Sequence, residues 1–286
     1  MLRQPRLDTC PTLDGGYDGD EMIRLVALDI DGTLLDSSNR LSEGNAAAVR
    51  EAMAQGTQVV LATSRWFHLA RLTAESLGLT TPLICHNGAL VKRPQDGEEL
   101  LHLRLDQDFA RQVAALGDQG RYMMFTTIDD VTYMRPQGKG PKRLPRDMRV
   151  SNYHAQAVAQ AAPTAILIFG EEAVDETWRA FYERFGQTVN FSRNHSLAFP
   201  HYLSLTHAEA DKGRALEMVC RELGVDPAEA MAIGDAEADV AMFSVVGCGI
   251  AMGNAPEAVR EAASDVAPQN DEDGVAWAIH KYVLDG

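Results

Sequence analysis

The sequence predicts an α/β protein: a doubly wound parallel sheet forms a core domain, and a second α+β domain is inserted into it. Three observations support this class. Short apolar runs alternate with helical stretches, as strands and helices of a parallel sheet do. Several of these runs end abruptly in polar residues, which is typical of buried strands. The alternation stops after residue 88 and returns after residue 202, so we place the insertion over residues 89–202 and the core over 22–88 and 203–286.

The first strand is predicted over residues 25–28 (LVAL), directly before Asp29-Ile30-Asp31-Gly32-Thr33. In open α/β sheets, ligands bind beyond the carboxyl ends of the strands. Residues two apart along a strand share a face, so we expect Asp29 and Asp31 to point into one site. Two carboxylates this close repel each other and require a cation or a proton.

The next elements repeat the strand and helix pattern. Ser42 is a helix cap, and Gly56 ends the helix near residue 54. A second strand over 58–62 ends in Thr63-Ser64-Arg65 and precedes a helix over 66–77. A third strand over 82–85 leads into Asn87-Gly88, a strong hairpin signal.

The inserted segment has a different rhythm, with hairpins among its helices. Expected helices cover residues from 108 onward, 153–161 and 171–185, and expected strands cover 122–128, 131–134, 165–169 and 188–191. A Pro- and Gly-rich stretch over 135–149 is basic, which is most often a solvated loop and alternatively a contact for an anionic substrate.

The parallel pattern is expected to resume with a strand over 202–206. Lys212 opens a helix that Gly224 ends. Strands then follow over 230–233, over 248–252 and around residue 266, and a closing helix covers 274–284. The first of these strands, over 230–233, ends in Gly234-Asp235 and, four residues after Asp235, Asp239.

Composition narrows the function classes. The formal charge of −15 argues against nucleic acid as a partner, since phosphate backbones require a basic face. No apolar run approaches the length of a membrane span. Residues 1–21 lack the apolar region of a secretory signal and are expected to be a flexible tail. Cys85, Cys220 and Cys248 lie in apolar contexts, so we expect reduced, buried thiols and a cytoplasmic protein.

The predicted strand ends bring together a distinctive set of side chains. They carry three or four carboxylates, a lysine and a hydroxyl, contributed by Asp29, Asp31, Thr63, Lys212 and the pair Asp235 and Asp239. Oxygen-only ligands with few histidines suit Mg²⁺, which also takes waters and a substrate phosphate.

This arrangement resembles the haloacid dehalogenase superfamily of phosphotransferases. The motifs that carry the resemblance are DIDGTLL from residue 29, Thr63, Lys212 and the GDxxxD of residues 234–239. The sequence is similar in particular to the Cof-type (class IIB) branch. The marks of that branch are TSR at 63–65, NGA at 87–89, AMGNA at 251–255 and the Asn-x-x-Asp-Gly-Val-Ala of 270–276. The resemblance covers about residues 22–286 and implies a Rossmann-like core with an α/β cap inserted between the second and third motifs.

The resemblance implies a role for each motif residue. Asp29 is the expected nucleophile, which forms an aspartyl phosphate, and Asp31 the expected general acid and base. Mg²⁺ is expected on Asp29, the Asp31 carbonyl and Asp235. Thr63 and Lys212 are expected to bind phosphoryl oxygens. The remaining expected substrate contacts are Ser64, Arg65, Asn87 and Gly88.

These assignments keep structural alternatives open. Asp239 is alternatively a helix cap, and Arg65 alternatively an ion-pair residue at a helix start. The family usually has Asn before the second Asp of the fourth motif, where this chain has Ala238. Glu237 or Asn254 compensates for that missing amide, or turnover is lower.

The expected function is a Mg²⁺-dependent phosphatase for small phosphorylated metabolites, foremost sugar phosphates. One alternative is a phosphomutase of the same superfamily. Another is a catalytically weakened phosphate-binding or regulatory protein. Receiver domains also combine acidic residues, Thr and Lys, but they lack a second Asp two residues after the acceptor and a large insertion. The sequence leaves the natural substrate and the oligomeric state open.

Overall fold

The computed structural model describes residue 10 and residues 22–135, 144–194 and 201–285. It divides into two compact units, which we describe separately. The first comprises Met1–Arg65, Leu69–Leu100 and Asp211–Gly286, and the second comprises Trp66–His68 and Leu101–Ala210. The expected insertion of 89–202 thus begins and ends earlier than the long segment of the second unit, Leu101–Ala210. Apart from Cys10, the expected tail of residues 1–21 lies outside the described residues.

The first unit alternates strands and helices, as the sequence pattern predicted. Its helices are α1 (Glu43–Ala54), α2 (Phe67–Leu77, whose first two residues belong to the second unit), α6 (Lys212–Leu223), α7 (Val240–Phe243), α8 (Glu257–Glu261) and α9 (Gly274–Ile279). Its strands are β1 (Leu25–Leu28), β2 (Gln58–Leu61), β3 (Leu83–Cys85), β4 (Leu90–Lys92), β5 (Glu99–His102, which reaches the unit boundary), β12 (Ala230–Gly234), β13 (Cys248–Met252) and β14 (Asp265–Ala267).

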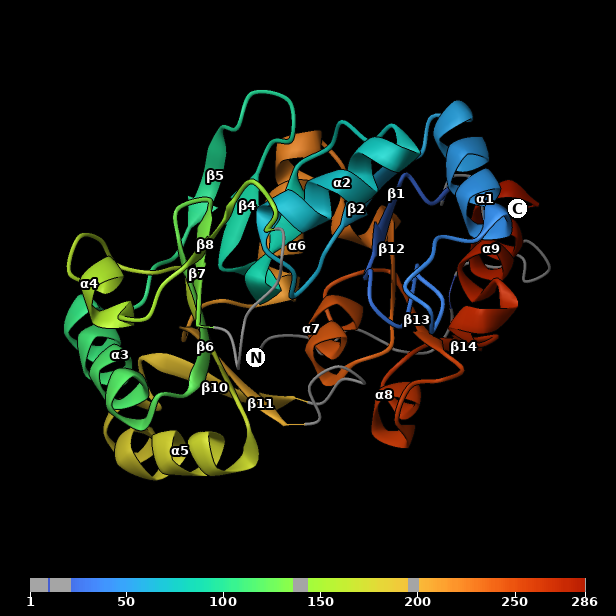
Figure 1. Cartoon of the computed structure of the whole chain (residues 1–286). Coiled ribbons are helices and arrows are strands. Elements are labelled where there is room, and N and C mark those ends of the chain that lie inside the picture. The colour runs from blue at the N-terminus through green and yellow to red at the C-terminus, as the bar shows by residue number, and fades with distance from the viewer. Residues whose placement is uncertain (1–9, 11–21, 136–143, 195–200, 286) are drawn as a thin grey trace, which may run out of the picture. The chain divides into compact units, whose positions relative to one another are not determined.

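Five of these strands form a parallel sheet in the order β14-β13-β12-β1-β2 (Figure 1). All residues of β1, β12 and β13 are buried, which explains their uninterrupted apolar runs. In the register, Leu28 at the end of β1 lies between Ile233 of β12 and Leu61 of β2. The carboxyl ends of three neighbouring strands therefore meet at one edge of the sheet, and the predicted doubly wound parallel sheet is confirmed.

Helix α1 begins where the sequence predicted. The Ser42 side chain accepts a hydrogen bond from the Asn45 amide, as an N-cap does. Asn45 itself is buried, and its side-chain oxygen accepts a 2.9 Å bond from the Ala276 amide of α9. The two helices lie side by side at one end of the sheet (Figure 1).

The predicted Asn-Gly hairpin is also present. Strands β3 and β4 pair antiparallel, with a single turn of 3₁₀ helix between them, and β5 extends this small sheet. Asn87 and Gly88 both have positive φ, 55° and 94°. A side chain at Gly88 would place its Cβ 2.3 Å from the Asp211 carbonyl oxygen, so only glycine fits there.

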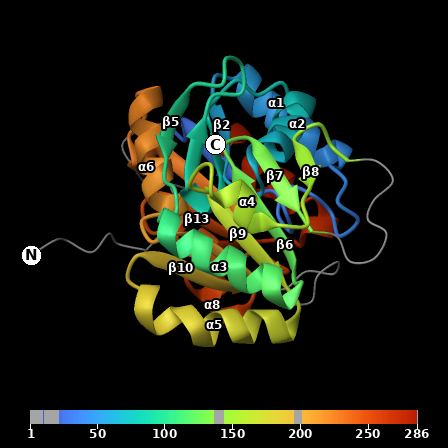
Figure 2. The same cartoon turned by 60° about the vertical axis from the view of Figure 1, so that its left-hand side comes forward.

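The second unit is an α+β layer structure. Its helices are α3 (Gln107–Gly120), α4 (His154–Val158) and α5 (Glu171–Phe185). Its strands are β6 (Met123–Ile128), β7 (Val131–Met134), β8 (Met148–Val150), β9 (Ala165–Phe169), β10 (Val189–Asn194) and β11 (Tyr202–His207). They form a sheet in the order β10-β11-β9-β6-β7-β8, and the three helices cover one of its faces through a core around Phe109, Ile166 and Leu205 (Figure 2).

One strand belongs to a different sheet than predicted. Residues 202–206 were expected to resume the parallel core sheet, but β11 pairs antiparallel with β9 and β10 in the second unit. Leu203 and Leu205 are fully buried, whereas Tyr202 and Ser204 are half-buried. This alternation is typical of an antiparallel strand with one buried face, and a short run of six residues does not distinguish the two cases clearly.

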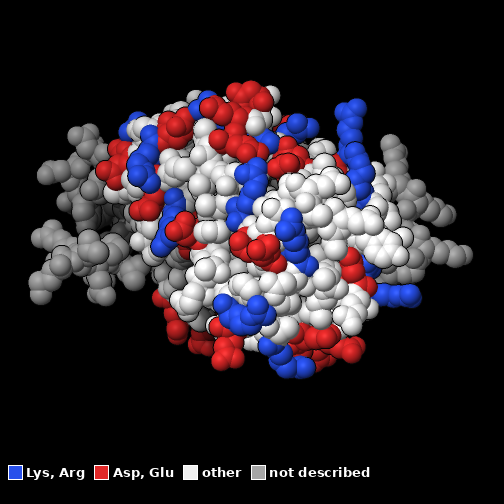
Figure 3. Space-filling model, turned by 90° about the vertical axis from the view of Figure 1, so that its left-hand side faces the viewer, with Lys and Arg blue, Asp and Glu red and all other residues white. Residues whose placement is uncertain are grey.

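The basic stretch 135–149 is only partly a solvated loop. Residues 136–143 lie outside the described residues. Arg135 is buried and donates hydrogen bonds of 2.7 Å to the Gly117 carbonyl and 2.6 Å to Asp118. Asp118 also accepts bonds from the amides of His154 and Ala155 at the start of α4. Arg135 therefore fixes α4 to α3. On the face shown in Figure 3, basic side chains are interspersed among acidic ones.

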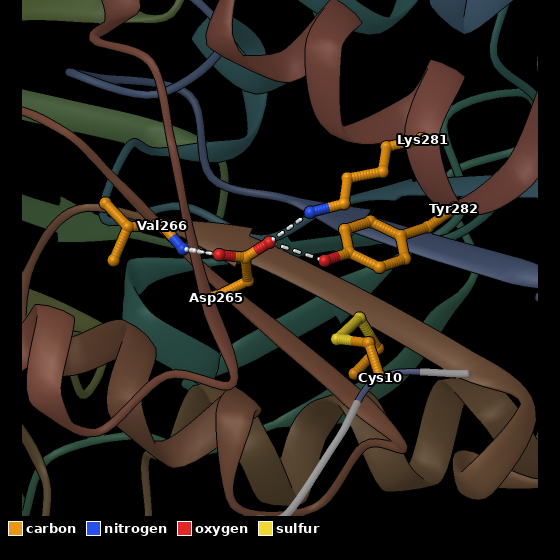
Figure 4. Close-up of a disulfide and its surroundings, with 6 residues drawn as sticks. Cys10, Asp265, Val266, Lys281 and Tyr282 are labelled. Carbon is orange, nitrogen blue, oxygen red and sulfur yellow. Dashed lines mark hydrogen bonds and ion pairs between the residues drawn. A yellow bond between two sulfur atoms is a disulfide. The ribbon is translucent and has the colours of Figure 1, made fainter. Parts of the chain in front are cut away.

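The cysteine prediction is wrong at one position. Cys85 and Cys220 are free and buried as expected, but Cys248 forms a disulfide with Cys10. Cys248 is the first residue of β13, so this bond lies at the amino end of the strand, away from the strand ends that carry the acidic residues. Figure 4 shows it beside Asp265, which accepts hydrogen bonds from Lys281 and Tyr282.

In the described part of the chain, every helix is too short or too polar to cross a membrane.

Candidate active site

A buried lysine joins two carboxylates at the carboxyl edge of the parallel sheet. Lys212 is the first residue of α6, which the Asp211 side chain caps. Its Nζ donates hydrogen bonds of 2.7 Å to Asp29 Oδ1 and 2.7 Å to Asp239 Oδ1. The three side chains are only 3%, 7% and 0% exposed. Charges buried this deeply require close partners, and each of these has one.

Asp239 braces the loop that follows β12. Its second oxygen, Oδ2, accepts hydrogen bonds of 3.0 Å from the Asp235 amide and 2.9 Å from the Ala236 amide. A side chain at Gly234 would place its Cβ 2.4 Å from the Asp239 Cβ, so glycine lets the loop close on this carboxylate. Asp239 makes no side-chain cap bond to the α7 helix that follows it. Asp239 does accept a bond from Ala236, the residue before the short 3₁₀ turn of Glu237–Asp239, so it caps that turn and also binds Lys212.

Asp235 lies against the turn after β1. Its Oδ1 accepts a 3.0 Å bond from the Thr33 hydroxyl. Gly32 has a φ of 81°, and a Cβ there would lie 2.3 Å from Asp235 Oδ2. Asn254, which follows β13, donates to the Gly32 carbonyl at 2.8 Å, and the same nitrogen lies 3.4 Å from Asp235 Oδ2. The Asp-Gly-Thr signal pointed to a tight turn, but neither Thr33 nor Gly32 was among the candidate site residues.

The carboxylates of the site perturb one another. Burial raises the pKa of Asp29 well above its ordinary value; the Lys212 ammonium opposes this effect, and Asp239 and Asp235 add to it. Burial and then the charge of Asp239 raise the pKa of Asp235 to about 6. The pKa of Lys212 is raised because the attraction of Asp239 and Asp29 outweighs the cost of burial. Perturbations of this kind are common at functional sites.

Asp31 is more exposed than the buried group and is paired with Arg65. The guanidinium donates two bonds to the carboxylate, 2.7 Å from Nε to Oδ2 and 2.6 Å from Nη2 to Oδ1. The Asp31 side chain is 44% exposed. Strand alternation put Asp31 beside Asp29, but β1 ends at Leu28, so the alternation no longer applies at residue 31. Arg65 therefore forms an ion pair, as the structural alternative for this residue predicted.

The other predicted residues form the loops around this group. Thr63 is fully buried, and its hydroxyl accepts a 3.1 Å bond from the Arg65 amide. Its carbonyl accepts a 3.0 Å bond from the Asn87 amide, which links the second strand end to the hairpin. Gly88 packs directly on Asp211, the cap of the helix that carries Lys212. Ser64 is exposed.

The acidic group has the donors and the charge that a divalent cation requires. Asp29, Asp235 and Asp239 each offer one oxygen within 4.8 Å of the others. Three carboxylates face one ammonium here, so the negative charge is not balanced by side chains of this group. Carboxylate oxygens without nitrogen or sulfur ligands suit Mg²⁺. Asp239 accepts three hydrogen bonds of 3.0 Å or less, whereas Asp29 accepts one and Asp235 accepts one of 3.0 Å and a longer contact of 3.4 Å, so Asp29 and Asp235 are the better placed ligands.

Comparison with known proteins agrees with this description. A family model described as haloacid dehalogenase-like hydrolase matches residues 26–279. The chain is 30% identical to the 5-amino-6-(5-phospho-D-ribitylamino)uracil phosphatase YcsE of Bacillus subtilis, over 92% of this chain and 96% of that one. It is also 30% identical to a phosphoglycolate phosphatase of Archaeoglobus fulgidus, over 90% and 95%.

Solved structures show the same similarity. TM0651 from Thermotoga maritima superposes with a TM-score of 0.78 at 28% identity, and the match covers 91% of this chain and 97% of that one. The similarity therefore extends over about nine-tenths of the chain and is not limited to the motifs.

Proposed function

Because the chain belongs to the haloacid dehalogenase-like hydrolase family, in its Cof-type branch, and is a phosphatase, we propose a specific reaction for it. It hydrolyses small phosphorylated metabolites, foremost sugar phosphates, with Mg²⁺ and through an aspartyl phosphate on Asp29. The observation that carries this proposal is the buried Asp29 carboxylate at the end of β1, with one oxygen held by Lys212.

Asp29 supplies the nucleophile in the first step. A carboxylate oxygen forms a bond to phosphorus, and the bond from phosphorus to the leaving oxygen breaks. The hydrogen bond from Lys212 to Oδ1 orients the carboxylate and leaves Oδ2 for the attack. Asp31, in its protonated form and released from the Arg65 guanidinium, gives a proton to the leaving oxygen.

The second step regenerates the enzyme. A water molecule attacks phosphorus, Asp31 takes its proton, and the bond between Asp29 and phosphorus breaks to release inorganic phosphate. Thr63 and Lys212 bind the phosphoryl oxygens in both steps, and the Ser64-to-Arg65 loop and the Asn87-Gly88 turn complete the substrate site. Phosphoryl transfer depends mainly on positioning and electrostatics, which this set of residues supplies.

Asp29, Asp235 and the Asp31 carbonyl are the residues that would hold Mg²⁺. The bound ion would offset the charge of the attacking and phosphoryl oxygens. Two features of the site support this assignment: its oxygen-only donors and its excess of negative charge over the single Lys212 ammonium.

Replacement of the nucleophile tests the proposal. We expect Asp29→Asn to lower phosphate release from p-nitrophenyl phosphate at least about 10³-fold while the thermal midpoint stays within a few degrees. Glu51→Gln, on the exposed side of α1, is the matched control and should keep full activity. Borohydride added during turnover should convert Asp29 to homoserine, which mass spectrometry detects. Full activity in Asp29→Asn would refute the nucleophile assignment.

Chelation tests the metal separately. EDTA should abolish phosphate release, and Mg²⁺ in excess should restore it. Activity that persists in EDTA would refute the metal requirement but leave the Asp29 assignment intact.

A substrate panel tests the leaving-group class. Relatives at 30% identity carry names that refer to a phosphorylated ribitylamino-uracil and to phosphoglycolate, so relatives of similar identity differ in substrate. We expect hexose and pentose phosphates to be hydrolysed with the highest kcat/KM. Conversion of one sugar phosphate into its isomer without phosphate release would instead indicate a phosphomutase.

A further inference from the structure

We propose that Asn254 is a positioning residue, which holds Asp235 and the Gly32 turn in the geometry that binds the cation. This inference rests on the proposed function, because it assigns a task at the same metal site. Asn254 follows β13, so it comes from a third strand end and is separated from Asp235 by 19 residues and from Gly32 by 222.

The Asn254 amide nitrogen bridges the two acidic loops. It donates to the Gly32 carbonyl at 2.8 Å and lies 3.4 Å from Asp235 Oδ2. The first bond fixes the turn between Asp29 and Thr33. The second, longer contact places a donor beside the oxygen of Asp235 that Thr33 does not hold, since Thr33 bonds Oδ1. The two oxygens of Asp235 thus each have one side-chain partner.

Hydrogen bonds to Asn270 and Leu35 fix the orientation of the Asn254 amide. Its oxygen accepts a 3.0 Å bond from the Asn270 amide, and the Asn270 side chain donates 2.9 Å to the Leu35 carbonyl. This orientation is the only one in which the nitrogen of Asn254 can face Gly32, because the oxygen is occupied by a donor. Leu35 belongs to the same segment that follows β1, so the chain of bonds closes on itself and resists rotation of the amide.

Asp235 requires such support in this chain. A rotated Asp235 carboxylate would lose its place among the three acidic oxygens, which lie within 4.8 Å of one another. The residue before Asp239 is Ala238, whose side chain has no hydrogen-bonding atom. Asn254 supplies an amide to this loop from another strand end. Residues that orient metal ligands typically change metal affinity by 10- to 100-fold when they are replaced.

The experiment measures Mg²⁺ binding without turnover. Because a ligand that binds only the folded state raises the thermal midpoint, titration of the midpoint with Mg²⁺ gives a dissociation constant. We compare the wild type with Asn254→Ala and with Asn254→Leu, which keeps the branched shape of the side chain without its polar atoms. Asn254 is exposed, so both variants should fold. Asn190→Ala is the control, since it removes an amide that bonds the His207 and Ala210 carbonyls in the second unit.

We expect both Asn254 variants to bind Mg²⁺ about 10- to 100-fold more weakly, while the control matches the wild type. The Mg²⁺ concentration for half-maximal phosphate release should rise by the same factor, and kcat at saturating Mg²⁺ should change by less than about tenfold. A dissociation constant within twofold of the wild-type value would overturn the positioning role alone. A wild-type protein whose midpoint does not respond to Mg²⁺ would overturn both this inference and the proposed metal site.

Discussion

Lys212→Met measures how strongly the buried ion pairs hold the site together. The ammonium is 3% exposed and bonds Asp29 and Asp239 at 2.7 Å each, so its removal leaves two buried carboxylates without their cation. Methionine fills a similar volume, and the cost is therefore mainly electrostatic. Breaking a buried ion pair by removal of one partner typically lowers stability by about 3–5 kcal/mol. We expect the free energy of unfolding to fall by an amount in this range at pH 8.

Urea unfolding in EDTA, followed by circular dichroism, measures this loss. Lys281→Met is the matched control, because Lys281 pairs with Asp265 at 2.8 Å but is 42% exposed. Exposed pairs contribute at most about 1 kcal/mol, so the control should lose much less. The loss in Lys212→Met should shrink as the pH falls, since the Asp29 carboxyl, whose pKa burial already raises, takes up a proton when its cation is gone. Equal losses in both variants, or a loss independent of pH, would refute the reasoning.

Three further predictions concern the rest of the fold. Burial lowers the pKa of His154 from 6.5 to about 4, so between these pH values the unfolded chain binds a proton that the folded protein does not. This group should therefore lower the free energy of unfolding by about 3 kcal/mol from pH 6.5 to 4. In urea unfolding, His154→Gln should lack this part of the pH dependence. Thiol titration of the denatured protein should find two thiols without reductant and four after reduction, whereas four thiols at the outset would exclude the Cys10–Cys248 bond. Reduction should lower the free energy of unfolding by about 2–4 kcal/mol. Gly88→Ala should reduce phosphate release and the thermal midpoint together, because its Cβ displaces the Asp211 backbone before Lys212; unchanged values would contradict this.

The features that were predicted correctly depend on residues that are close together in the sequence. Strand β1 and the turn after it were predictable because an uninterrupted apolar run followed by Asp and Gly has few other structures. The start of α6 at Lys212 follows from the Asp211 cap, and the hairpin at Asn87-Gly88 follows from residues that tolerate positive φ. The motif residues therefore lie at predictable places along the chain.

The tertiary structure decided which of these residues meet. Asp239 was ambiguous in the sequence, and only the fold brings Lys212, 27 residues away, to its oxygen. Two other contacts also join different strand ends: the Arg65 guanidinium binds Asp31, and the Asn254 amide lies beside Asp235. The bond between Cys10 and Cys248 spans 238 residues. Local preferences fix where a strand ends, but the partner of a polar side chain depends on which other ends the sheet order places beside it, and that order arises from packing of the whole chain.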